Sequence, residues 1–96
     1  MSQNEKIALE QIAAIAPRSR LQWEPAQQAH VLLYPEGMIK LSDTAAEILK
    51  RVDGAATVEQ IIADLERSYP GADLRDDVLE FLEAAYARGW ISIQDR

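Results

Sequence analysis

The sequence contains no cysteine and only one histidine, His30. Without cysteine the chain has no disulfide, no thiolate nucleophile and no cysteine ligand for zinc or an iron–sulfur cluster. A single histidine cannot form a zinc triad or an ordinary nucleophile–base–orienter set, and its place in a strand pattern favours a plain strand residue. The four glycines are scattered, so no loop could cradle a phosphate. We therefore expect no enzyme activity, no metal and no cofactor of its own.

The chain also lacks any apolar run near the ~20 residues that span a membrane. Its first residues, MSQNEKIALEQ, do not have the basic and apolar regions of a secretory signal. We therefore expect a soluble cytoplasmic protein with no membrane partner.

Positive charge is scarce, because ten Lys and Arg face sixteen Asp and Glu, giving a net charge of −6. This excess of carboxylates disfavours nucleic acid as a partner. It suits a basic or amphipathic partner, or it simply keeps a small protein in solution.

The length of 96 residues and the apolar share of 48% fit one globular domain. Residues 1–17 carry apolar positions at helical spacing that end at Pro17, which predicts an N-terminal arm, either helical or flexible. Residues 18–96 are expected to form a single domain.

Three short strands are predicted in the first part of this domain. Residues 21–23 alternate, and residues 29–34 are rich in β-formers. In the stretch LLYPEGMIKLS, Pro35 and Gly37 fit a tight turn, and residues 38–41 then form the third strand. The pattern predicts a small antiparallel sheet whose last strand has a free edge.

Three helices with apolar stripes follow, and WISI at residues 90–93 is a last extended piece. The whole pattern predicts an α+β fold of the winged helix-turn-helix type, with a small three-stranded antiparallel sheet followed by a three-helix unit. The first predicted helix begins at the run Ser42-Asp43-Thr44, which offers several N-cap oxygens, and Thr44 with Glu47 has capping-box spacing. The other two begin at the capping signals Thr57 with Gln60 and Asp73 with Asp76. The three helices are predicted to end at Gly54, Pro70 and Gly89.

The third predicted helix is acidic. Five acids and two bases give it the wrong sign for the major groove of DNA, where a winged helix usually inserts its last helix. A divalent metal site is also disfavoured, because adjacent helical residues point 100° apart and acids near a helix start are favoured by the helix dipole. We expect a solvated acidic patch, formed by Asp76, Asp77, Glu80 and Glu83.

The apolar arc of the same helix is about 160° wide, where one packed face needs somewhat over 100°. An ordinary core stripe is formed by Leu74, Val78, Phe81 and Ala85. The surplus comes from Leu79, Leu82 and Tyr86. Either neighbouring segments cover both flanks of the stripe, or these three residues form the wall of an open groove with Arg75 at its rim.

An open groove of this kind would suit a partner peptide that adds as a strand to residues 38–41, with its alternate side chains against the helix. In that strand Ile39 and Leu41 share one face, and Met38 and Lys40 the other. Lys40 is either a charge that guards the bare edge against aggregation or a solvated side chain.

Five segments together carry a resemblance to a known family: VLLYPEGMIKLS, TAAEIL, DG-x-x-TVEQII, VLEFL and RGWI. In this order, over about residues 18–94, the chain resembles the pyrroloquinoline quinone (PQQ) biosynthesis protein D family. The resemblance implies a winged helix-turn-helix-like peptide chaperone without enzyme activity. Such a protein binds the ribosomal precursor peptide and presents it to a radical SAM enzyme, which carries the iron–sulfur clusters and cross-links a Glu and a Tyr.

In relatives the leader peptide adds to the third strand and lies against the third helix. By matching position, the resemblance implies a peptide-binding site formed by Met38, Ile39, Lys40, Leu41, Arg75, Leu79, Leu82 and Tyr86.

Two other readings stay open at this point. One is an acidic winged-helix transcription regulator that binds DNA or another regulator. The other is an interaction subunit that uses the same edge to dimerise, with residues 25–28 or 34–37 as hinges for strand exchange. The chain is thus expected to be a monomer or a strand-swapped homodimer.

Overall fold

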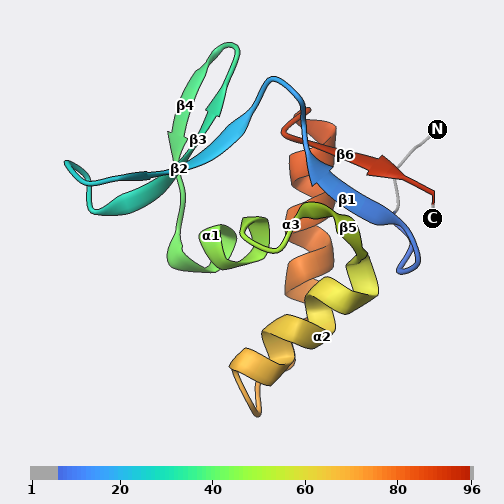
Figure 1. The fold of residues 1–96 in the computed structure, drawn as a ribbon. Helices are drawn as coiled ribbons and strands as arrows, with labels where there is room; N and C mark the ends of the chain where they lie inside the picture. The colour runs from blue at the N-terminus through green and yellow to red at the C-terminus, as the bar shows by residue number, and fades with distance from the viewer. Residues whose placement is uncertain (1–6, 96) are drawn as a thin grey trace.

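The computed structural model describes residues 7–95, which form six strands and three helices (Figure 1). The predicted α+β class is confirmed, and the strands form two three-stranded antiparallel sheets instead of one. The elements are β1 Ile12–Ile15, β2 Arg20–Glu24, β3 Ala29–Tyr34, β4 Gly37–Lys40, α1 Asp43–Leu49, β5 Asp53–Thr57, α2 Val58–Ser68, α3 Arg75–Ala87 and β6 Ile91–Gln94. No helix in this part of the chain is long and apolar enough to span a membrane.

The first sheet, here called the hairpin sheet, has the order β2-β3-β4 and is built from two consecutive hairpins. Its three strands match those predicted from the sequence. Leu32 at its centre is fully buried and belongs to the core, against which Leu21 and Ile39 also pack. Pro35 and Glu36 form the turn between β3 and β4, and Tyr34 pairs with Gly37 across it.

The second sheet, here called the core sheet, has the order β5-β1-β6 and joins segments far apart in the sequence. Its central strand is β1, where Ala13 is fully buried. The prediction of a helical or flexible arm is therefore wrong for Ile12–Ile15, because the apolar spacing of this short run fits a strand as well as a helix. Residues 1–6 of the predicted arm lie outside the described residues.

The first two helices begin at side-chain caps. In α1 the cap is Ser42, one of the three N-cap residues that the sequence offered, and its Oγ accepts from the Ala45 N–H at 3.1 Å. The Thr44–Glu47 capping box is wrong, because Thr44 already lies inside the helix. In α2 the predicted capping box is confirmed, with Thr57 and Gln60 bonding each other's backbone N–H groups. Gly54 does not end α1, which stops at Leu49; it lies in β5, with a positive φ of 80°.

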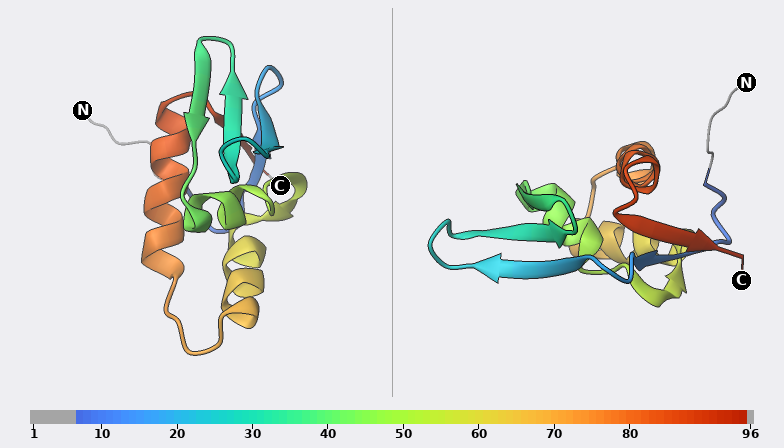
Figure 2. Two further views of the ribbon diagram at one scale, coloured as in Figure 1. Left: turned by 90° about the vertical axis from the view of Figure 1, so that its left-hand side faces the viewer. Right: turned by 90° about the horizontal axis from the view of Figure 1, so that it is seen from above.

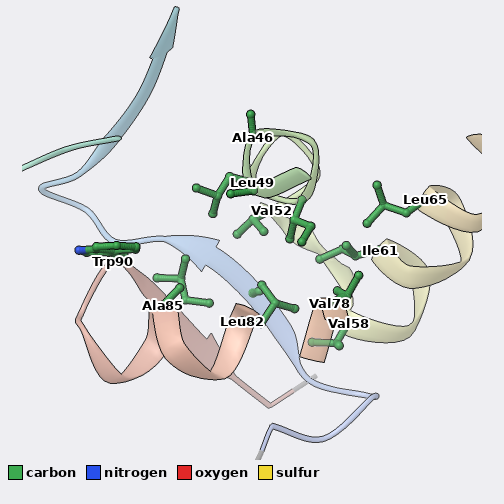
Figure 3. Close-up of a cluster of buried hydrophobic side chains, with 14 of the residues drawn as sticks. Ala46, Leu49, Val52, Val58, Ile61, Leu65, Val78, Leu82, Ala85 and Trp90 are labelled. Atoms are coloured by element: carbon green, nitrogen blue, oxygen red, sulfur yellow. The ribbon is translucent and has the colours of Figure 1, made fainter. Parts of the chain in front are cut away.

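Helix α3 begins without a side-chain cap, because its N-cap position is Leu74 and not the predicted Asp73. It places Val78, Leu82 and Ala85 in the core, together with side chains from α1, α2 and the core sheet (Figure 3). The largest fully buried side chains are Leu32, Ile48, Leu49, Ile61, Ile62, Leu82, Val31, Val58 and Val78.

Candidate functional site

Strand β4 forms an open edge of the hairpin sheet, because within residues 7–95 it pairs only with β3. The Leu41 N–H donates to the His30 carbonyl oxygen at 2.9 Å. Alternate residues of an antiparallel strand bond to the same neighbour, so Ile39 also points its backbone groups toward β3. The N–H and C=O groups of Met38 and Lys40 therefore face away from the sheet. This edge offers two donors and two acceptors to an incoming strand.

The side chains of this edge alternate as the sequence predicted. Ile39 packs against the core and Leu41 is buried in it. Met38 is 48% exposed and Lys40 is exposed on the opposite face. A strand added here would thus present every second side chain to the core side of the sheet.

An apolar pocket of about 240 Å³ lies between α1, α2 and the start of α3. Only Leu41 and Ser42 separate β4 from α1, whose first turn lines this pocket, so the pocket begins close to the end of the open edge. Figure 2 (left) shows β4 running down into α1 with α2 beneath it. The lining residues are Thr44, Glu47, Ile48, Leu65, Tyr69, Ala72, Leu74, Asp77 and Val78.

The pocket combines an apolar interior with an acidic rim. An apolar cavity of about 150 Å³ is large enough to bind benzene, so this one has room for an aromatic or branched aliphatic side chain. At the rim, hydrogen bonds from Lys50 and then Arg51 lower the pKa of Glu47, which keeps this carboxylate ionised at neutral pH. Asp77 adds a second carboxylate. The arrangement favours an apolar side chain flanked by a basic one.

Leu82 does not line any surface, because it is fully buried in the core stripe of α3. The prediction that it forms a wall of an open groove is therefore wrong. The stripe of buried residues is centred on Val78, Leu82 and Ala85, while Leu74 and Phe81 are only partly buried at its margin. A charge at Leu82 would destabilise the fold rather than report on binding.

The predicted wall residues Leu79 and Tyr86 lie on the flank of α3 that faces the N-terminal segment. Glu83, one turn from each of them, accepts a hydrogen bond from the Ile7 N–H at 3.4 Å. Leu79 and Tyr86 are partly buried against the core, and Arg75 is exposed one turn before Leu79. The N-terminal segment thus lies next to this flank, and Arg75, Leu79 and Tyr86 remain proposed site residues.

The opposite flank of α3 faces the pocket through Leu74, Asp77 and Val78. Sequence reasoning missed these three as site residues, because a helical wheel shows the width of an apolar arc but not which flank meets which neighbour. The sequence did contain one signal for this flank. Leu74 and Val78 belong to the apolar stripe, and Asp77 lies between them in the sequence and supplies a carboxylate.

One end of the hairpin sheet is held by contacts with Trp90. At the far end of the hairpin sheet, the rings of Tyr34 and Trp90 lie 6.0 Å apart, and the Arg88 guanidinium lies 5.3 Å from the Trp90 ring centroid. These contacts fix the hairpin relative to the end of α3.

Among the residues described, no cluster of three or more His, Asp or Glu is placed to hold a metal.

Comparison with known proteins assigns the chain to a family. The family model for "Coenzyme PQQ synthesis protein D (PqqD)" matches residues 29–91. The chain belongs to the PqqD family. A relative from Stutzerimonas stutzeri (strain A1501), named "PqqA binding protein", is 50% identical over 90 residues, which is 93% of this chain and 98% of the relative. One of the same name from Azotobacter vinelandii is 56% identical over 75 residues, which is 77% of this chain and 82% of the relative.

A solved PqqD structure shares the fold. It is the solution NMR structure of the PqqD truncation of Methylobacterium extorquens PqqCD, described as a functional and stand-alone recognition element for ribosomally synthesized and post-translationally modified peptides. The TM-score is 0.74 at 30% identity, over 90% of this chain and 94% of the other. The resemblance to the PQQ biosynthesis protein D family and the fold that it implied are thus confirmed.

Proposed function

We propose that this PqqD-family chain is a non-enzymatic chaperone that binds PqqA, the ribosomal precursor peptide of PQQ. The observation that carries the proposal is the open edge of β4, which leads directly to an apolar pocket. Support also comes from relatives about half identical to it that are named for binding PqqA.

The peptide is proposed to add as a fourth strand to the hairpin sheet. The backbone groups of Met38 and Lys40 bond to it, and Ile39 and Leu41 stand beside its core-side side chains. Main-chain bonds of this kind give affinity and register, and side-chain pockets give specificity. The pocket between Leu74, Ile48 and Tyr69 takes one apolar side chain of the peptide.

The proposed role is to present the bound peptide to a radical SAM enzyme that cross-links a Glu and a Tyr of PqqA. The support for this step is the family resemblance and the chemistry of the chain itself. A chain without cysteine has no thiolate ligands for the iron–sulfur clusters of such an enzyme, so these would belong to the partner. The one histidine has a structural role. The ring centroids of His30 and Trp23 lie 5.1 Å apart in an edge-to-face arrangement, which is an ordinary cross-strand pair.

The test is a titration of the ¹⁵N-labelled protein with PqqA, followed by NMR. We expect the largest shift changes at Met38 and Lys40 on the edge and at Leu74 and Val78 at the pocket. Changes confined to the acidic patch, or no saturable binding, would contradict the proposal.

The same titration decides which flank of α3 meets the peptide. Smaller changes at Arg75, Leu79 and Tyr86 are expected, because that flank faces the Ile7 segment. Dominant changes there would show instead that the N-terminal segment moves aside for the peptide.

A further inference from the structure

A second hollow, of about 330 Å³, lies at the end of the hairpin sheet remote from the pocket. It is formed between the link from β1 to β2 and the turn from β3 to β4, which Figures 1 and 2 both show side by side. We call it the hairpin hollow. Its lining residues are Pro17, Arg18, Ser19, Arg20, Leu33, Tyr34 and Pro35.

The shape of the hairpin hollow is fixed by the core. On one side the Ala16 N–H donates to the Trp90 carbonyl oxygen at 3.0 Å, and the Ser19 N–H donates to the Ala16 carbonyl oxygen at 2.9 Å. On the other side the Tyr34 ring rests beside the buried Trp90 ring. Both walls are thus anchored to one core residue.

The hairpin hollow carries free positive charge. Arg18 and Arg20 are exposed, and neither forms an ion pair within the described part of the chain; Arg20 only donates to Gln22 Oε1 at 3.4 Å. By contrast, Lys50, Arg51 and Arg67 all pair with carboxylates. Guanidinium groups without a carboxylate partner are well suited to bind one from another molecule.

Charged side chains are also distributed unevenly along the chain, with the positive excess in the hairpin region. Residues 17–40 contain three basic and two acidic side chains, while residues 41–95 contain five basic and twelve acidic ones. The hairpin is thus the positive part of a negative molecule. Complementary potentials of this kind select the orientation of a partner.

We infer that the hairpin hollow docks an acidic segment of a second protein, in which an Asp or Glu stands next to an apolar side chain. The carboxylate meets Arg18 and Arg20, and the apolar side chain meets Leu33 and the prolines. This inference rests on the proposed function, in which the partner is the enzyme that acts on the bound peptide. The hairpin hollow adjoins the start of β4 and leaves its edge free, so enzyme and peptide can bind together.

The experiment compares two double variants with the same change in charge. In the test variant Arg18→Glu and Arg20→Glu are combined; in the control Lys50→Glu and Arg67→Glu are combined, and all four positions are exposed. Affinity for the purified radical SAM enzyme is measured by calorimetry, and affinity for PqqA is measured separately. We expect the test variant to lose about tenfold or more in enzyme affinity at low salt, with PqqA binding within about twofold of wild type.

Four outcomes would overturn the inference. The first three are equal losses in both double variants, enzyme binding that is unchanged by the test variant, and a wild-type protein that does not bind the enzyme. A parallel loss of PqqA affinity in the test variant would also overturn it, because the hollow would then belong to the peptide site. Failure of PqqA to bind the wild type, in contrast, contradicts the proposed function itself.

Discussion

The two sheets have the same number of strands but are assembled in opposite ways. The hairpin sheet uses three consecutive strands joined by tight turns, whereas the core sheet joins the beginning, middle and end of the described chain around β1. The hairpin sheet forms without hydrogen bonds to the outer edge of β4, so that edge is available to another chain. The core sheet holds together three distant segments, so its loss would undo the whole fold.

The largest effect that tests this contrast is expected in the core sheet. Ala13→Asp places an unpaired charge at a fully buried position between β5 and β6, which should lower the free energy of unfolding by about 3–5 kcal/mol. Urea denaturation measures the change. The control is Ser92→Asp at an exposed position of β6, expected to cost less than about 1 kcal/mol. Similar small effects at both positions would mean that β1 is not a core strand.

A pair of proline variants separates folding from binding in the hairpin sheet. Ile39→Pro removes an N–H that points toward β3 and leaves its acceptor unpaired, which should destabilise the protein by about 1–3 kcal/mol. Met38→Pro removes an N–H on the open edge, where proline is tolerated, so the fold should survive. It should lose about 1 kcal/mol of PqqA affinity, roughly fivefold.

Circular dichroism and calorimetry with PqqA measure the two properties. If Met38→Pro binds the peptide normally, the edge is not the binding surface. If it unfolds as Ile39→Pro does, the two residues do not point to opposite sides of the strand.

The smallest expected effect concerns the pH dependence of β5. Hydrogen bonds from the N–H groups of Ala56 and Ala55 to the Asp53 carboxylate, each 2.9 Å, lower the pKa of this group. A lowered folded-state pKa stabilises the protein above the unfolded pKa of about 4, and this contribution is lost as the pH falls through the folded value.

Asp53→Ala should therefore reduce stability at pH 6 by less than about 1 kcal/mol, since solvent screens the exposed group, and by less still at pH 3. Thermal unfolding at both pH values measures the difference between wild type and variant. A difference that does not shrink on acidification would show that the Asp53 charge is not the source of the stabilisation.

The contrast between local and distant contacts also decides which parts of the fold could be predicted from the sequence. The turn chemistry of Pro35 and Gly37 and the capping box at Thr57 act over a few residues, and both elements were found where the sequence placed them. Strand β1 was predicted as helical or flexible, since its partners lie about 40 and 80 residues away in the chain and four apolar residues carry no period of their own. Strand β5 was missed because DGAAT contains few β-formers and is held by β1.

The candidate site divides along the same line. The free edge at residues 38–41 could be predicted, because strand order within two hairpins is local. Which flank of α3 faces the pocket could not be predicted, because the direction in which each flank points depends on where Ile7 and α1 pack. Leu82 was thus placed on the surface when it lies in the core.

The short open edge of β4 also has a kinetic consequence. Two donors and two acceptors allow four main-chain hydrogen bonds, which contribute together about 2–6 kcal/mol. Ordering a flexible peptide costs about 2–5 kcal/mol, so the edge on its own leaves almost no net affinity. For a peptide bound as proposed, the residence time would then depend on the side chain in the pocket, and withdrawal of that side chain would lead to rapid dissociation. For the proposed function such a weak edge is an advantage, since release to an enzyme would require the loss of one side-chain contact and not the separation of a long strand pair.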